Sequence, residues 1–195
     1  MNVLEKGKDY LIVLKEAGEN SEKTGFDGYS ALYRLDVPVR GILVLAARGS
    51  EVEVTDKEYR VVCSGRMEQD HLEMTDLLFH DSRSNRTFPV KRMRKGVREA
   101  RLKADVLEYD KANDLSLVSA VLDTGRTHQI RAQFASRKHP VAGDGTYGSR
   151  VQCPVALMCA RITYRASATD ETKILTIPAA DIYPWNLFDQ SAETV

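Results

Sequence analysis

Alternation of apolar and charged positions is clearest in the middle of the chain. Between residues 100 and 106 every second position is Ala, Leu, Ala and Val, and each position between them is charged. Because successive side chains of a β-strand point to opposite faces, this pattern predicts a half-buried strand. Residues 115–122 alternate again, and the polar segment 110–114 between the two runs has the composition of a hairpin loop. The pattern therefore predicts an antiparallel pair.

Other segments predict further strands and one helix. Short β-prone apolar runs occupy residues 10–14, 42–47, 59–63, 156–164 and 173–177. Ile130 and Phe134 recur at helical spacing, Thr127 is available as an N-cap, and basic residues follow at 137 and 138, so we expect a helix over residues 127–138. Residues 72–88 lack a clear period and are expected to hold short strands and turns. Many strands with one helix predict an α+β domain on a mixed, largely antiparallel sheet.

Length and composition favour one ordinary globular domain. A chain of 195 residues with 43% hydrophobic residues can bury a sizeable core. No apolar run approaches the ~20 residues that cross a bilayer, and the N-terminus lacks the apolar region of a signal peptide. The three cysteines lack C-x-x-C spacing and nearby histidines, so we expect reduced, structural thiols. These features predict a cytoplasmic protein that does not bind a membrane.

The charges are balanced overall but not locally. The 28 basic and 28 acidic residues exclude nucleic-acid binding through overall charge alone. One basic run interrupts this balance, and it comprises Lys91, Arg92, Arg94, Lys95, Arg98, Arg101 and Lys103 against the single acid Glu99. A solvated surface and a surface that follows phosphates look identical in sequence, so the residues leave both readings open.

Asp36 lies at a turn that leads into the apolar core. In the stretch YRLDVPVRGILVLA, residues 33–46, Pro38 and Gly41 interrupt the backbone before the apolar run begins. From these residues alone, the simpler reading is an aspartate that holds a turn by hydrogen bonds to nearby amides.

Three motifs in order resemble a known enzyme family. The Asp36 stretch is similar to H-R-L-D-x-x-T-S-G, KEYRVVCSG (residues 57–65) to a K-x-Y strand with a closing glycine, and TGRTHQIRAQFASRKHPVAGDGTYG (residues 124–148) to G-R-x-H-Q-[IL]-R followed by H-P-I-x-G-D-x-x-Y. These motifs resemble those of the RluA-type RNA pseudouridine synthases. With DYLIVLKEAG near the start and PW near the end, the resemblance covers nearly the whole chain.

The resemblance implies a pseudouridine synthase-like catalytic domain over residues 1–188, a C-terminal tail over 189–195, and no S4-type RNA-binding domain. The implied partner is ribosomal or transfer RNA, and the implied reaction uses no cofactor and no metal. We expect a monomer. The residues do not indicate which RNA, or which uridine within it, is the substrate.

The resemblance also assigns roles to individual residues. Asp36 would be the catalytic carboxylate, adding to C6 of the base or attacking C1′ of the ribose. Arg126 would pair with it and keep it ionised against desolvation. Tyr59, which on a strand would otherwise read as core packing, would be the third catalytic residue, stacking on the target uracil and assisting proton transfer at C5 through its hydroxyl. Arg34, Arg92, Arg94, Lys95 and Arg131 are expected to contact RNA, and Leu35, His128 and Gln129 to support the site. His128 is not expected to donate a proton in the reaction.

Three positions depart from the family pattern, and two alternatives remain. Tyr33 stands where the motif has His, and Val39 and Arg40 stand where it has Thr and Ser. One alternative is a non-catalytic RNA-binding protein or RNA folding chaperone that retains the fold. Another hydrolytic use of Asp36 is disfavoured, because glycoside hydrolysis normally needs two opposed carboxylates and no motif places a second one.

Overall fold

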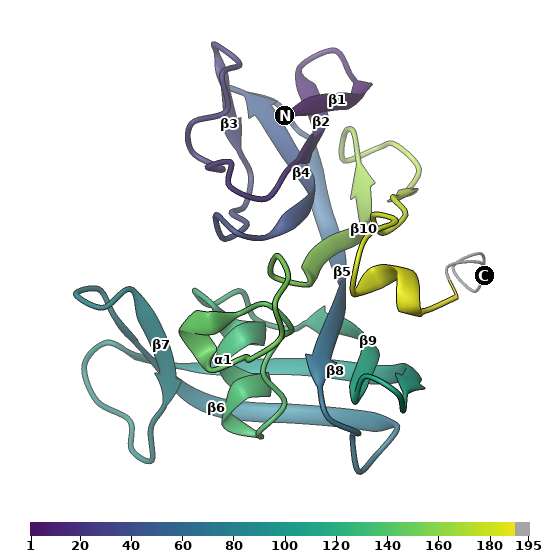
Figure 1. Ribbon diagram of the computed structural model, residues 1–195. Coiled ribbons are helices and arrows are strands. Elements are labelled where there is room, and N and C mark those ends of the chain that lie inside the picture. The colour runs from purple at the N-terminus through teal and green to yellow at the C-terminus, as the bar shows by residue number, and fades with distance from the viewer. Residues whose placement is uncertain (190–195) are drawn as a thin grey trace. The chain divides into compact units, whose positions relative to one another are not determined.

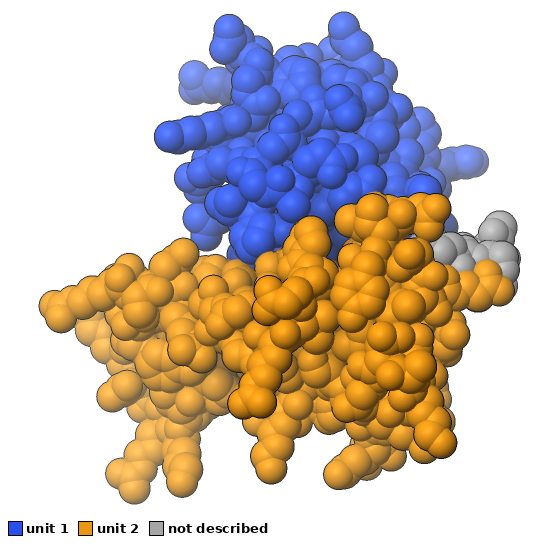
Figure 2. Space-filling model, viewed as in Figure 1, with its two compact units in different colours: residues 1–59, 157–179 blue, residues 60–156, 180–195 orange. Residues whose placement is uncertain are grey.

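The computed structural model describes residues 1–189, which form two compact units. Unit 1 contains residues 1–59 and 157–179, and unit 2 contains residues 60–156 together with the chain from residue 180 (Figure 2). The predicted C-terminal tail, 189–195, lies outside the described residues apart from Asp189.

Unit 1 is built on strands from both ends of the chain (Figure 1). Its strands are β1 (Asn2–Lys6), β2 (Tyr10–Lys15), β3 (Tyr29–Ala31), β4 (Arg40–Ala47), β10 (Leu157–Arg165) and β11 (Lys173–Thr176). The pairs β1–β2, β2–β4, β3–β4 and β10–β11 are antiparallel, whereas β10 and β4 are parallel.

The core of unit 1 explains why its strands read as continuous apolar runs. Ile42, Leu43, Val44 and Leu45 follow one another along β4, and all are fully buried. Burial of consecutive positions means that both faces of the strand are covered, so no alternation is needed. Gly41 begins this run with φ of 145°, and a Cβ there would lie 2.5 Å from the backbone nitrogen of Cys159. Only glycine permits this close approach of β4 to β10.

Unit 2 carries an antiparallel sheet and the α-helix. Strand β5 (Glu53–Ser64) runs into unit 2 from Arg60, and the elements that follow are β6 (His71–Asp81), β7 (Arg86–Pro89), β8 (Val97–Asp110), β9 (Leu115–Leu122), α1 (Gln129–Ser136), and the short 3-10 helices η1 (Gly145–Tyr147) and η2 (Trp185–Leu187). The strand order is β9-β8-β6-β7, with antiparallel pairing at each step. Helix α1 contacts β7 and β6.

The predicted hairpin is confirmed, and its alternation ends where a bulge interrupts it. On β8, Ala100, Leu102 and Ala104 are buried and the charged residues between them are exposed. The register of the β8–β9 pair shifts between Val106 and Glu108. Leu107 is the extra residue of this bulge and has no paired position on β9, and its side chain is 48% exposed.

The segment 72–88 forms longer strands than predicted. Most of it belongs to β6, an 11-residue strand that pairs with β8 along nine positions, and the rest belongs to the hairpin with β7. The turn itself falls where polar residues suggested one. The Asp81 carboxylate accepts the backbone N–H of Arg83 at 3.0 Å and the Ser84 hydroxyl at 2.7 Å, and Asn85 takes a positive φ of 48°. Pairing with β8, rather than local periodicity, defines β6.

The helix is shorter than predicted and begins differently. The prediction of residues 127–138 is corrected to Gln129–Ser136, and His128, with φ of 53°, occupies the N-cap without a side-chain cap. Thr127 precedes the cap position, and its carbonyl accepts the Thr87 hydroxyl at 2.8 Å. Lys138, beyond the end of the helix, takes φ of 69°.

The α+β fold class on a mixed, largely antiparallel sheet is confirmed, with α1 as the one α-helix of residues 1–189. Among those residues no helix has the length and hydropathy to span a membrane. All three cysteines are free thiols, and Cys63 and Cys159 are buried. The single catalytic domain over 1–188 stays a prediction.

Candidate active site

In unit 1, the loop that carries Asp36 is held by a buried serine. The Ser21 hydroxyl donates to the carbonyl of Leu35 at 2.9 Å and accepts the Leu35 backbone N–H at 3.0 Å. Both side chains are buried, at 3% and 6% exposure. Because Ser21 satisfies both backbone groups of the residue before Asp36, it fixes the direction in which the chain enters the turn. Leu35 is the apolar anchor of the same turn.

A buried lysine holds the loop on the other side of Asp36. Lys15 is fully buried, and its ammonium donates to the carbonyls of Asp36 at 3.2 Å, Val37 at 3.1 Å and Val39 at 2.7 Å. The carbonyl of Glu16 also lies 3.2 Å from Nζ. Burial lowers the pKa of Lys15, an effect opposed by the negative charges of Glu19, Asp36 and Glu16. These carbonyls converge on one cation, which fixes the curvature of the turn.

The residues that depart from the family pattern also brace this loop. The Tyr33 hydroxyl donates to the carbonyl of Ile42 at 2.8 Å, which ties the start of the loop to β4. Lys57 Nζ lies 4.9 Å from the centre of the Tyr33 ring. Arg40 donates from Nε to Glu16 at 3.1 Å. The replacements therefore supply contacts of their own within unit 1.

Tyr59 shares the environment of Asp36. It is 6% exposed at the unit 1 end of β5. Burial, and then the charges of Cys159 and Asp36, raise the pKa of Tyr59 well above its usual value. Asp36 and Tyr59, two of the three predicted catalytic residues, both belong to unit 1, and their joint role in catalysis stays a prediction. The structure also explains why a core reading of Tyr59 was plausible, since the ring is largely buried.

Arg34, next to this turn, is exposed and forms an ion pair with Glu22 at 3.1 Å. An exposed pair of this kind is weak and screened by salt. Because the pair is weak, the guanidinium of Arg34 remains available to phosphate. The predicted contact of Arg34 with RNA stays a prediction.

In unit 2, the predicted third catalytic residue lies in the turn before α1. Arg126 is exposed, and its Nε donates to the carbonyl of Glu99 at 2.9 Å. Gln129 supports the turn, because its side-chain oxygen accepts the Arg126 backbone N–H at 3.0 Å and the Thr124 hydroxyl at 2.9 Å. Its amide nitrogen donates to the carbonyl of Arg101 at 3.0 Å. Pairing of Arg126 with Asp36 stays a prediction.

The prediction for Arg131 needs correction. We expected Arg131 to contact RNA, but its side chain is only 5% exposed. It forms a two-pronged ion pair with Asp144, with Nε at 2.6 Å from Oδ2 and Nη2 at 3.0 Å from Oδ1. A charge that is buried and paired in this way is not available as a surface contact to phosphate. Arg131 instead joins α1 to the segment that precedes η1.

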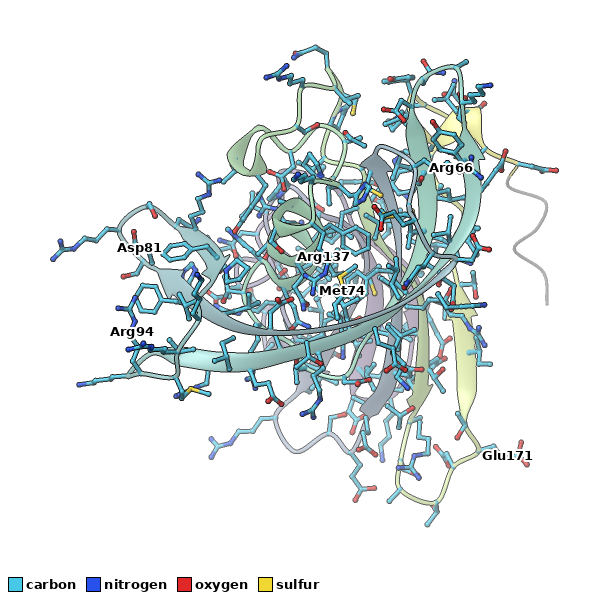
Figure 3. All side chains as sticks on the ribbon, turned by 90° about the horizontal axis from the view of Figure 1, so that it is seen from below. Arg66, Met74, Asp81, Arg94, Arg137 and Glu171 are labelled. Carbon is cyan, nitrogen blue, oxygen red and sulfur yellow. The ribbon has the colours of Figure 1, made fainter. Side chains whose placement is uncertain are left out.

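His128 is likewise held within unit 2, where its Nδ1 lies 3.0 Å from the hydroxyl of Tyr147. This contact agrees with the supporting role assigned to His128, which stays a prediction. By contrast, Arg92, Arg94 and Lys95 are all exposed, in the loop between β7 and β8. Figure 3 labels Arg94 and Asp81, which lie at the same end of this sheet.

Lys15 and Ser21 are the supporting residues that reading the sequence missed. Lys15 ends the apolar run YLIVLK, and a lysine there is normally read as the polar boundary of a strand. Ser21 lies in a polar, glycine-bearing stretch where a buried side chain is not expected. Nothing in the local pattern signals their contacts with the carbonyls of the Asp36 loop, which span 14 to 24 positions.

Comparisons with known proteins give one consistent result. A family model described as RNA pseudouridylate synthase matches residues 14–136. An uncharacterized RNA pseudouridine synthase of Aquifex aeolicus is 32% identical over 133 residues, covering 64% of this chain and 41% of that protein. The ribosomal large subunit pseudouridine synthase D of Nitrosomonas europaea is 32% identical over 130 residues, covering 60% of this chain and 35% of that protein. The chain thus matches less than half the length of these relatives.

Solved structures agree on the fold. The protein named human RNA pseudouridylate synthase domain containing 1 matches with a TM-score of 0.74 and 22% identity, over 91% of this chain and 83% of that one. Human RNA pseudouridylate synthase domain containing 4 matches with a TM-score of 0.73 and 15% identity, over 95% and 91%. Since the family model takes in more than half of the 195 residues, the chain belongs to the RNA pseudouridylate synthase family.

Proposed function

We propose that this protein converts a specific uridine to pseudouridine in structured ribosomal or transfer RNA, with Asp36 as the catalytic carboxylate. The observation that carries the proposal is the turn of Asp36, whose backbone is held by hydrogen bonds from the buried side chains of Lys15 and Ser21. A rigid backbone holds a reacting group in one orientation, which is a large part of catalytic advantage. Family membership supplies the class of reaction.

The reaction is an isomerisation and needs no redox step. The N1–C1′ bond of uridine breaks, the freed uracil turns, and C5 bonds to C1′, while C5 loses a proton and N1 gains one. Asp36 serves either by adding to C6 of the base or by attacking C1′, and it is released when the new bond has formed. Either route requires the ionised carboxylate.

Tyr59 contributes its ring and its protonated hydroxyl. A base that has been flipped out of the RNA gains about 1–3 kcal/mol by stacking on an aromatic side chain. Burial, followed by the charges of Cys159 and Asp36, raises the pKa of Tyr59, which favours the protonated phenol.

Arg126 is proposed as the cation that keeps Asp36 ionised, with Leu35, His128 and Gln129 as supports. Arg34, Arg92, Arg94 and Lys95 are proposed to bind the RNA backbone. Their exposure suits phosphate contacts, which supply most of the affinity of proteins for nucleic acids.

We further propose that the protein acts in the cytoplasm as a monomer and without cofactor or metal. Buried free thiols at Cys63 and Cys159 suit a reducing compartment. Cell fractionation and light scattering after size-exclusion chromatography test location and oligomeric state. Full activity after chelator treatment would support metal independence.

Release of tritium from RNA labelled at C5 of uridine tests the proposed reaction. Mapping of pseudouridine in total RNA, from cells with and without the gene, would then identify the RNA and the position. If the purified protein binds cellular RNA tightly but releases no tritium from any of it, the protein is an RNA-binding protein or chaperone and not an enzyme.

A further inference from the structure

Residues 82–98 form a cationic arm on unit 2, comprising the β6–β7 turn, β7 and the loop into β8. The arm contains seven lysines and arginines and no carboxylate. Arg83 and Arg86 belong to the hairpin, and Lys91, Arg92, Arg94 and Lys95 to the loop, and all are exposed. The positive charge of this segment is complementary to the negative charge of a polyanion such as RNA.

The arm is ordered by its own contacts. The backbone N–H of Val97 donates to the carbonyl of Arg94 at 3.0 Å, and that of Val90 donates to Leu77 at 2.8 Å. The Phe79 ring packs against Phe88 with 5.7 Å between ring centres, and the Arg94 guanidinium lies 5.2 Å from the centre of the Phe79 ring. A surface that is already shaped loses less entropy when it binds.

Thr87 fastens the arm to the segment that starts α1. The Thr87 hydroxyl donates to the carbonyl of Thr127 at 2.8 Å, so it must accept the contact from His80 Nδ1 at 3.0 Å. The Thr87 backbone N–H donates to the Tyr147 hydroxyl at 2.8 Å. Thr87 is buried, at 2% exposure, so these bonds are not exchanged for water.

Tyr147 completes the attachment. Its hydroxyl accepts the Thr87 backbone N–H and forms a second hydrogen bond, of 3.0 Å, with Nδ1 of His128. The guanidinium of Arg86 lies 5.3 Å from the ring centre and that of Arg131 lies 5.0 Å from it. One ring therefore contacts a cation of the arm and a cation of α1.

We propose that the cationic arm is an RNA-docking surface and that Thr87 and Tyr147 are positioning residues, which hold it in a fixed orientation relative to the start of α1. This inference rests on the proposed function and deepens it by naming the residues that orient the bound RNA. Neither residue touches the reacting uridine. Both act through the cations of the arm.

The test is RNA affinity of matched variants, measured by fluorescence anisotropy with unfractionated transfer RNA and with deproteinised ribosomal RNA. Tyr147→Phe keeps the ring and removes the hydroxyl, and Tyr109→Phe is the control, since it removes a hydroxyl bonded to exposed Asp114 at 2.9 Å in the same unit. Tyr147→Phe is expected to raise the Kd about 5-fold, the equivalent of one neutral hydrogen bond, and to make the salt dependence shallower. Tyr109→Phe is expected to change neither.

A second pair covers the case in which Tyr147→Phe does not fold. Thr87→Ser keeps the hydroxyl and should retain the parent affinity, whereas Thr87→Val loses the hydroxyl and should raise the Kd. The inference is overturned if folded Tyr147→Phe and Thr87→Val both bind as the parent does, if Tyr109→Phe weakens binding equally, or if the parent binds neither RNA in a salt-dependent way. Failure of the proposed function gives a different result. If the parent releases no tritium but the variants show these changes in Kd, the arm binds RNA and the protein is not an enzyme.

Discussion

The ammonium of Lys15 lies 3.2 Å from the main-chain carbonyl oxygen of Asp36, so a buried cation fixes the backbone of the proposed catalytic residue. Lys15→Met, which keeps most of the apolar stem, would leave the carbonyls of Asp36, Val37 and Val39 without this donor. We expect a loss of stability of about 2–4 kcal/mol, because buried acceptors without partners are costly. We also expect a lower kcat in the protein that remains folded. Urea unfolding and single-turnover kinetics measure the two effects, and an unchanged kcat would limit Lys15 to stability.

Asp36→Asn tests the chemistry most directly. The amide is nearly isosteric with the carboxylate but cannot act as its nucleophile, so tritium release should be abolished. RNA affinity should remain within a few-fold of the parent. An active Asp36→Asn variant would contradict the proposed mechanism.

Tyr59 should show no titration of its own in the pH dependence of turnover. Its pKa is raised by burial and by the charges of Cys159 and Asp36, so the protonated phenol is favoured and ionisation moves to still higher pH. The kcat profile of the parent should therefore have no alkaline limb from Tyr59 below about pH 10. Tyr59→Phe should keep the shape of that profile and the RNA affinity, with reduced kcat.

Tyr59→Ala is the companion variant, since it removes the stacking surface as well. It should weaken base capture and cost several kcal/mol of stability, as aromatic truncations in cores do. If Tyr59→Phe and Tyr59→Ala both unfold, the residue is core packing and its site assignment is wrong.

Arg126→Ala and Arg131→Ala should fail in different ways. Arg126 is exposed, so its loss should abolish turnover with little effect on stability. Arg131 is buried against Asp144, and removing it leaves a buried carboxylate unpaired, at a cost of about 3–5 kcal/mol. Thermal unfolding and tritium release distinguish the two. An active Arg126→Ala variant would remove Arg126 from the chemistry.

Neutralising the loop of the cationic arm should weaken RNA binding and its salt dependence. Replacement of Arg92, Arg94 and Lys95 by glutamine should make the slope of log K against log salt concentration less steep. The expected change is up to ~0.9 for each phosphate that the arm no longer neutralises, which is the value for duplex B-DNA. The matched control neutralises Lys8, Lys111 and Lys173, which are also exposed and change the net charge equally. Equal effects in both triple variants would mean that total charge, and not the arm, governs affinity.

The sequence predicted elements whose pattern is local and missed contacts made at long range. The hairpin of β8 and β9 follows from alternation, and the buried run on β4 from continuous apolar residues. The length of β6 does not, because its pairing with β8 defines it. The motifs indicated Asp36 and Tyr59, whereas Lys15 and Ser21 have ordinary local surroundings.

The same distinction explains the error at Arg131. In the sequence, Arg131 cannot be distinguished from an arginine at the surface. Its partner Asp144 is 13 positions away in a glycine-rich segment. Burial depends on packing that no short pattern encodes. The exposed state of Arg92, Arg94 and Lys95, by contrast, follows from their place in a long polar run.

The two-pronged pair between Arg131 and Asp144 also constrains how this protein can change over evolutionary time. Each of these buried charges is stabilised by the other, so a first substitution at either position removes the two-pronged ion pair and lowers stability. In natural variants, positions 131 and 144 are therefore expected to change together, and lineages that lose the acid should lose the arginine as well. We therefore expect substitutions to occur independently at the exposed loop tips and in pairs at positions 131 and 144.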